Sequence, residues 1–413
     1  MRAYIPTALA LLLCGAATSG ALGDPIRPDA ASPRNVAKTH AAALVLDAHA
    51  DIEIPGKEDR FVGPDGRSRV APDKLRAGGV DAIVLDVAVG PEPVRDGYAR
   101  KLADEKLAAV LEMVGNPANG MVLARTAADV RAAHRRGKIA VILGFQNADI
   151  LGKDIAGLDY FYDQGVRVFA LNHLGHNGYA DSSRSEAGLH VPPLHFGLSP
   201  LGRSAIGRIN DLGGVLDVTQ LSKDATLQAV QLSRAPVIAS HSNVRTLSEA
   251  TRNLSDEEID AIAAKGGVIC VTPFVGYLYD SSDKELVSKI RAVRREAGLM
   301  EDFMYPYDLY WTIQDLEKRK DFRDKMAVVL GPGTIESMVD HIDYLVKRVG
   351  IDHVGIGSDF NHGGGIENFA EASQAMNVTA ALLKRGYSRK DIEKIWGGNF
   401  LRVMAQAAKA RRS

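Results

Sequence analysis

The chain has 413 residues, of which 46% are hydrophobic and 24% are charged, and its formal net charge is −1. This composition is typical of a folded globular protein with a large core, arranged as one large domain or two smaller ones. The sequence has no long run of Lys or Arg, so neither a nucleic acid nor an anionic membrane is expected as a partner. A small ligand with little net charge fits the composition better.

Residues 1–23 have the pattern of an export signal. Arg2 gives a short basic start, Ala8 to Cys14 form an apolar core, and Ala21 to Gly23 resemble a small-residue cleavage site. The apolar core is too short to span a bilayer, so we expect cleavage after residue 23 and a periplasmic or secreted protein without a transmembrane span. A lipid anchor on Cys14 would need a small residue before it, and Leu13 is not small. We therefore favour simple cleavage.

Eight short apolar runs recur along the chain, each followed by a polar or Gly-containing turn and then a segment with helical periodicity. Because the runs are continuously apolar, we expect strands buried on both faces, as in a parallel sheet covered by helices. Eight such units predict a (β/α)8 barrel of the TIM type, with an open doubly wound sheet as the alternative. The runs are Leu44 to Ala50, Val80 to Val89, Ile139 to Phe145, Val166 to Asn172, Gly214 to Thr219, Pro236 to Ser240, Gly267 to Thr272 and His353 to Ser358.

Residues 24–413 are expected to form a single domain with an insertion after the seventh strand. The insertion covers residues 276–333 and is placed where barrel enzymes carry lids and specificity walls. Its aromatic residues, among them Tyr277, Tyr279 and Tyr305, could hold an apolar side chain of a substrate. They could equally pack the insertion against its own barrel or against the second subunit of a homodimer. Cys270, in the seventh run, is expected to be a buried structural thiol.

Polar side chains close most of the predicted strands. Active sites of barrel enzymes lie at the carboxyl ends of the strands, and neutral His nitrogens with Asp oxygens suit zinc and similar divalent metals. Alternation along an extended strand sends His49 and Asp51 to the same side. The sequence therefore predicts a metal site at the barrel mouth. The residues at the strand ends are His49, Asp51, Gln146, His173, Gln220, His241 and Asp359.

Several motifs together resemble the membrane (renal-type) dipeptidase family, peptidase family M19, over nearly all of the chain after the export signal. They are Asp47-Ala48-His49-Ala50-Asp51, Ser240-His241-Ser242-Asn243, Arg252-Asn253, the stretch from His341-Ile342-Asp343 through His353 to Phe360, and Gly398-Asn399-Phe400. The resemblance implies a barrel metallohydrolase with two zinc ions that are bridged by a glutamate.

The resemblance also implies a role for each matching residue. His49 and Asp51 would hold the first metal, and His241 would hold the second together with a histidine at the end of the fifth strand. Arg252 would bind the C-terminal carboxylate of a dipeptide. His173 would polarise the scissile carbonyl, and Asp359 would orient the attacking water and the substrate amine. Tyr277, from the insertion, is our candidate for a further substrate contact.

Two positions depart from the family pattern. Gln146 stands where the bridging glutamate belongs, and Gln220 stands where the fifth-strand histidine belongs. Two dications about 3.5 Å apart repel each other by roughly 19 kcal/mol at an effective dielectric of about 20, so the loss of a bridging anion matters. We therefore expect one tightly bound zinc, with Gln146 and Gln220 as weak ligands of a second site that is weak or empty.

The resulting hypothesis is a metal-dependent hydrolase that uses water activated by the metal. It would cleave the amide bond of dipeptides or similar small N-acyl amino acids. One alternative is a peptide-binding pseudoenzyme with a degraded metal site, and another is a tailoring enzyme for a secreted peptide natural product. His190, His195 and His362 could supply a missing ligand from loops, although we expect them to face solvent. His134, His176 and His341 are expected at the surface.

Overall fold

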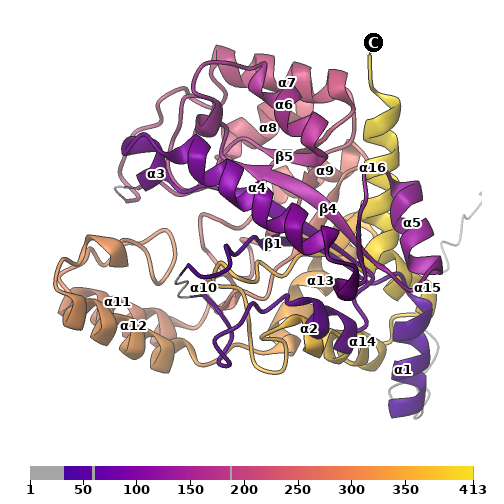
Figure 1. Ribbon diagram of the computed structural model, residues 1–413. Helices are drawn as coiled ribbons and strands as arrows, with labels where there is room; N and C mark the ends of the chain where they lie inside the picture. Colours follow the sequence, from indigo (N-terminus) through magenta and orange to yellow (C-terminus); the bar gives the residue numbers. More distant parts are fainter. Residues whose placement is uncertain (1–31, 58–60, 187, 413) are drawn as a thin grey trace, which may run out of the picture.

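The computed structural model describes residues 32–57, 61–186 and 188–412, and within them eight parallel strands form a barrel surrounded by helices (Figure 1). The export signal expected over residues 1–23, including Cys14, lies outside the described residues. The barrel strands follow one another in the order β1, β2, β4, β5, β6, β7, β8, β9. Their bounds are β1 Leu46–Asp51, β2 Ala82–Ala88, β4 Ile139–Gln146, β5 Val166–Ala170, β6 Val215–Asp217, β7 Ile238–Ala239, β8 Val268–Val271 and β9 Val354–Ile356.

The last strand returns to the first and closes the barrel. The backbone N–H of Asp51 donates to Phe360 O at 3.0 Å, and that of Asp359 donates to His49 O at 2.9 Å. These bonds belong to a parallel bridge that extends β9 along β1. The prediction of a (β/α)8 barrel is confirmed, and the alternative of an open sheet is wrong, because an open sheet would leave these edge groups unpaired.

A ninth short strand was not expected from the sequence. It is β3, Met121–Leu123, and it pairs in parallel with residues 139–141 at the start of β4, off the barrel path. Three residues with an exposed Val122 in the middle give no buried apolar run, which is the signal that identified the other strands.

Helices cover the outside of the barrel, as continuous apolar strands require. Residues 105–114, where Leu, Ala and Val recur at helical spacing, lie within α4. Ser255 caps the start of α9, where the Glu258 side chain accepts from the Ser255 N–H at 2.8 Å. The helices are α1 Pro33–Ala42, α2 Pro72–Ala77, α3 Pro91–Arg95, α4 Ala99–Gly115, α5 Ala127–Arg135, α6 Gly157–Gln164, α7 Pro200–Leu212, α8 Lys223–Leu232, α9 Asp256–Ala264, α13 Ile335–Val349, α14 Ala375–Lys384, α15 Arg389–Glu393 and α16 Asn399–Lys409. None of the described helices is both long and apolar enough to cross a membrane.

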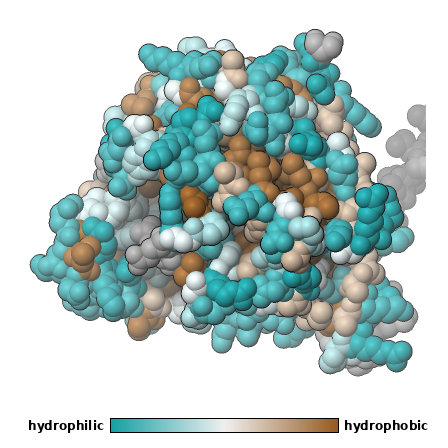
Figure 2. Space-filling model, viewed as in Figure 1, coloured by the Kyte–Doolittle hydropathy of each residue, from teal (hydrophilic) through white to brown (hydrophobic). Residues whose placement is uncertain are grey.

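The insertion after β8 carries three further helices, α10 Val275–Leu278, α11 Lys284–Glu296 and α12 Leu316–Leu330. In Figure 1, α11 and α12 stand to one side of the barrel, and in Figure 2 this part of the surface is mostly hydrophilic. The helices have a core of their own, in which Tyr279 and Tyr305 are buried with Ile290 and Phe322. Most of the aromatic set therefore packs the insertion, which was one of the two expected roles. Cys270 in β8 is a buried free thiol.

Candidate metal centre

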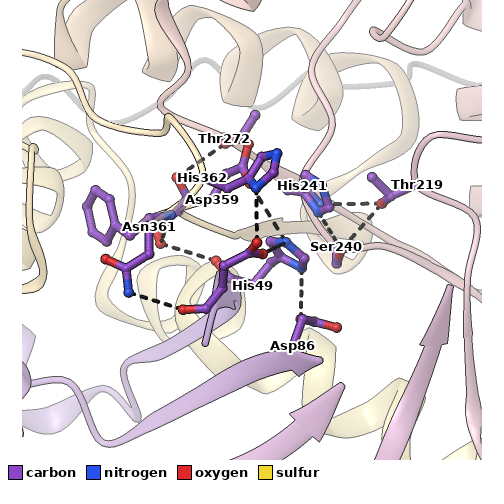
Figure 3. A network of polar contacts seen from close by, with 12 residues as sticks. His49, Asp86, Thr219, Ser240, His241, Thr272, Asp359, Asn361 and His362 are labelled. Carbon is purple, nitrogen blue, oxygen red and sulfur yellow. Dashed lines mark hydrogen bonds and ion pairs between the residues drawn. The ribbon is translucent and has the colours of Figure 1, made fainter. Parts of the chain in front are cut away.

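Three potential metal ligands meet at the carboxyl ends of the barrel strands. His49 comes from β1, His241 follows β7 and Asp359 follows β9, and one ligand atom from each lies within 4.8 Å of those of the other two (Figure 3). All three side chains are buried. Sequence reasoning selected each of them from its position at the end of an apolar run or directly after one, and the closed barrel brings them together.

A carboxylate inside the barrel sets the orientation of His49. Asp86 Oδ2, from β2, lies 2.8 Å from His49 Nδ1 in a buried ion pair whose hydrogen-bond geometry is imperfect. His49 Nε2 therefore faces the centre. Burial alone would lower the pKa of His49, but the nearby carboxylates outweigh burial and hold that pKa well above its ordinary value. A carboxylate that fixes the orientation of a ligating histidine is typical of metal sites.

Asp86 was missed in the sequence, although a single acidic residue within a continuously apolar run is a usable signal. Gly144 on the neighbouring strand β4 faces it, and a Cβ at this position would lie only 1.9 Å from Asp86 Oδ1. The absence of a side chain at Gly144 therefore leaves room for the carboxylate that supports His49.

His241 is prepared as a neutral ligand. Its Nδ1 is 2.7 Å from Ser240 Oγ, which leaves Nε2 available, and its ring stacks on that of His49 with centroids 3.7 Å apart. Burial, followed by the positive charges of His49 and Arg252, lowers the pKa of His241 well below its ordinary value. A neutral imidazole is the form that coordinates a metal.

Asp51 lies at the edge of this cluster. Its Oδ1 is 3.5 Å from His49 Nε2, and Asp359 Oδ1 is 3.7 Å from the same nitrogen. Tetrahedral zinc with bonds of about 2.0 Å places its ligand atoms about 3.3 Å apart, so both carboxylates fit a metal bound at His49. Asp51 Oδ1 is also buried without a hydrogen-bond partner among the described residues, as expected of an atom reserved for a metal. The donor set therefore fits one divalent ion.

The expectation that His362 faces solvent was wrong, because its ring contacts the second oxygen of Asp51. His362 does not face solvent as a free loop residue. Its Nδ1 bonds Asp51 Oδ2 at 2.9 Å, and its Nε2 lies 3.1 Å from His173 Nε2. The loop after β9 makes this possible because Asp359 and Asn361 adopt left-handed backbone conformations, with φ of 55° and 62°, and turn the chain back over the mouth.

The remaining loop and surface histidines do not join the centre. His190 is exposed as expected, and His195 Nε2 bonds a backbone oxygen, Asn177 O, at 2.9 Å. The expectation that His341 lies at the surface was wrong. It is buried and its Nδ1 accepts the N–H of Val244 at 3.0 Å, because the inner face of α13 packs on the loop after β7.

The two glutamines also face the barrel interior. Gln146 ends β4 and Gln220 follows β6, and both are buried. Gln146 Nε2 and Gln220 Oε1 have no hydrogen-bond partner among the described residues, and no bond is found between the two amides. A buried amide atom without a hydrogen-bond partner costs free energy. We therefore expect each of these two atoms to contact a polar group that is not part of the protein.

Arg252 and Tyr277 lie beside the cluster on its outer side. The guanidinium of Arg252 donates to His241 O at 2.7 Å and to Ser242 Oγ at 3.0 Å, and it lies 5.6 Å from the centre of the Tyr277 ring. Burial lowers the pKa of Arg252 to about 10. No described carboxylate pairs with this arginine within 4.0 Å, so its charge is available to a ligand.

A buried group of imidazole and carboxylate ligands at the mouth of a (β/α)8 barrel defines a metal-dependent hydrolase fold of the TIM-barrel type. Residues 34–413 match the family described as membrane dipeptidase (peptidase family M19), and the chain belongs to this family.

Named relatives agree with this assignment. The chain is 32% identical over 290 residues to dipeptidase tcpJ of Claviceps purpurea (strain 20.1), an alignment that covers 69% of this chain but only 55% of that protein. The crystal structure of the probable dipeptidase PvdM from Pseudomonas aeruginosa matches with a TM-score of 0.79 and 35% identity, over 92% of this chain and 100% of that one. A metallo peptidase from Rhodobacter sphaeroides, liganded with a phosphinate mimic of L-Ala-D-Ala, shares the fold with a TM-score of 0.65 at 21% identity, over 88% and 99% of the two chains.

The support of His49 by Asp86 can be tested through metal affinity. We expect Asp86→Asn to weaken zinc binding by about tenfold to 100-fold, because the neutral amide no longer fixes the imidazole. Titration calorimetry of the metal-free protein with zinc would measure this effect. Asp81→Asn is the matched control, since Asp81 also contacts a histidine Nδ1, His134, at 2.8 Å but lies directly before β2, away from the mouth. Equal affinities of D86N and the wild type would refute the role of Asp86.

Proposed function

We propose that this protein is a metal-dependent peptidase that hydrolyses the amide bond of dipeptides or similar small N-acyl amino acids. The observation that carries the proposal is the buried cluster of His49, His241 and Asp359 next to an unpaired buried arginine, Arg252. A metal and an anion-binding group side by side suit a short substrate with a terminal carboxylate. The relatives named dipeptidases, and the dipeptide mimic bound to the Rhodobacter sphaeroides protein, support the same substrate class.

The metal we propose is a single zinc ion held by His49, His241 and Asp359, with Asp51 within reach. When bound, zinc supplies a Lewis acid that polarises a carbonyl and lowers the pKa of water. By the family resemblance, Gln146 and Gln220 occupy the positions of two ligands of a second ion, and each amide has an atom without a partner among the described residues. Neutral amides do not screen two dications from each other, so the second site is weak or empty.

The protein's own side chains would position and serve the substrate. Arg252 binds the terminal carboxylate, and Tyr277 packs beside it. Burial lowers the pKa of His173 well below its ordinary value, so this imidazole is neutral. Its Nε2 faces His362, and its Nδ1, which has no partner among the described residues, would donate to the scissile carbonyl oxygen in the tautomer that is protonated at Nδ1. Asp359 is buried at the same place, and it would hold the metal through one carboxylate oxygen while the other takes a proton from water and returns it to the leaving amine.

The number of metal ions can be tested by restoring the family ligands. We expect the wild-type protein to bind one zinc tightly, and the double variant Gln146→Glu with Gln220→His to bind two, because the bridging anion and the missing imidazole return together. Metal analysis after dialysis against metal-free buffer would measure the stoichiometry. The matched control is Gln228→Glu, at a partly exposed glutamine on α8 whose Nε2 donates to Phe196 O. Two tightly held ions in the wild type would contradict the one-metal proposal.

The activity can be tested with a panel of L,L and L,D dipeptides, with one and then two equivalents of zinc. We expect hydrolysis with one equivalent, and we expect amidation of the C-terminus to lower kcat/KM by at least about tenfold because Arg252 loses a charge-assisted pair. The Arg252→Met variant should show a similar decrease of kcat/KM on peptides with a free C-terminus and almost no decrease on amidated peptides. The control is Arg245→Met, whose guanidinium contacts only backbone oxygens, Asn253 O and Thr251 O, among the described residues.

Two outcomes of this panel would redirect the proposal. Peptide binding without turnover under any metal condition would favour the pseudoenzyme, in which the buried amides of Gln146 and Gln220 replace a working second site. Turnover of only a longer or modified peptide would favour a tailoring enzyme for a peptide natural product. Equal loss of activity of R252M on free and amidated peptides would contradict the role of Arg252.

We also propose that the protein is exported and that residues 1–23 are removed on the way. The support is the basic start, apolar core and small-residue site of this segment. Expression in a Gram-negative host, followed by intact mass measurement of the periplasmic fraction, should give a chain that begins at Asp24. A cytoplasmic protein that retains Met1 would refute export.

A further inference from the structure

A second buried arginine, Arg184, lies near the barrel mouth and is not part of the family resemblance. It follows β5 on the same loop as His173, and its residue is 7% exposed. Its backbone is held on both sides, because its N–H donates to Ser182 Oγ at 3.1 Å and its carbonyl accepts the N–H of Gly175 at 2.9 Å. The position of this side chain is therefore well defined by the loop.

The guanidinium of Arg184 shares Tyr277 with Arg252. Arg184 Nη1 donates to the Tyr277 hydroxyl at 2.7 Å, and the guanidinium lies 5.2 Å from the centre of the Tyr305 ring. Arg252 lies 5.6 Å from the centre of the same Tyr277 ring. One tyrosine thus separates two buried cations at the edge of the metal centre.

Among the described residues no carboxylate lies within ion-pair distance of Arg184, although Asp359 and Asp308 favour its charged form from farther away. In the part of the chain that the structure describes, its Nε has no hydrogen-bond acceptor and none of the ion pairs includes this side chain. A tyrosine hydroxyl and a ring face stabilise a guanidinium much less than a carboxylate does. Burying a charge without a counterion costs several kcal/mol, so a retained buried cation at a binding site indicates an anionic group on the ligand.

The charge of Arg184 acts on the groups of the metal centre. It contributes to the lowered pKa of His173 and to the lowered pKa of Arg252, in both cases after burial, and Asp359 is among the groups that favour its own charged form. The overall composition suggested a ligand with little net charge, but the mouth itself carries two unpaired arginines.

We propose that Arg184 is a second anion-binding residue, and that the preferred substrates carry a carboxylate on the side chain of their C-terminal residue. Arg252 holds the terminal carboxylate and Arg184 holds the side-chain carboxylate, on either side of Tyr277. This inference rests on the proposed function, because it takes Arg252 as the site of the terminal carboxylate. It adds the substrate class, which is a dipeptide ending in Asp or Glu.

The test compares zinc-loaded protein with L-Ala-L-Asp, its neutral isostere L-Ala-L-Asn, and L-Ala-L-Ala. Binding is measured by calorimetry at low temperature and hydrolysis by kcat/KM. We expect the wild type to prefer L-Ala-L-Asp over L-Ala-L-Asn by at least about tenfold, as one charge-assisted pair provides. Arg184→Met should remove this preference while L-Ala-L-Ala changes less than about threefold, and Arg184→Lys should retain part of it.

The matched control is Arg95→Met. Arg95 is exposed and pairs with Glu186, which lies on the loop that carries Arg184. It should leave the preference unchanged. A wild-type ratio near one between L-Ala-L-Asp and L-Ala-L-Asn would overturn the inference without requiring any variant. An equal loss of affinity or kcat/KM in R184M on acidic and neutral peptides would also overturn it. Absence of hydrolysis for all three peptides would instead refute the proposed activity, while the binding preference would still decide the role of Arg184.

Discussion

The metal centre depends on the seam where the last barrel strand meets the first. His49 and Asp359 are separated by most of the chain, yet the N–H of Asp359 donates to His49 O at 2.9 Å. The seam is reinforced inside the barrel, where Ser358 donates its N–H and its hydroxyl to the carboxylate of Asp47 at 2.8 and 2.6 Å. A slip of one residue in a strand would turn its side chains to the opposite face, so this pairing fixes which groups reach the mouth. The metal ligands inherit their geometry from the closure of the barrel rather than from local sequence.

Much of the fold could be predicted because burial on both faces leaves a direct mark on the sequence. The eight barrel strands appeared as continuous apolar runs, whereas β3 did not, since a three-residue strand off the barrel path does not need such a run. The location of the insertion also followed from its length between two runs. The way its aromatic residues pack could not be predicted, because a Tyr that fills a core and a Tyr that holds a substrate have the same sequence signature.

The candidate site was predictable only where position along a strand determines position in space. His49, His241 and Asp359 close strands, so parallel pairing brings them together. His362 and Arg184 lie on loops, and their contacts depend on how the chain turns: two left-handed residues return the loop of His362 to Asp51, and backbone bonds to Ser182 and Gly175 hold Arg184 in place. Such turns of non-glycine residues are not evident from sequence alone.

Charge at the mouth connects the number of metals with the nature of the substrate. Asp51, Asp86 and Asp359 are carboxylates that contact the imidazole of His49, and Arg184, Arg252 and Lys106 are basic side chains near them, with Lys106 Nζ 4.0 Å from Asp51 Oδ2. If all six are ionised, the set is neutral without a metal. One dication then leaves two positive charges, which a dipeptide such as L-Ala-L-Asp, with two carboxylates and one ammonium group, would reduce to one. Two dications with the same dipeptide would leave three positive charges in a buried space of low dielectric. The two proposals therefore agree in electrostatic terms: a site that holds one metal, with glutamines at Gln146 and Gln220, suits a substrate that carries more than one negative charge.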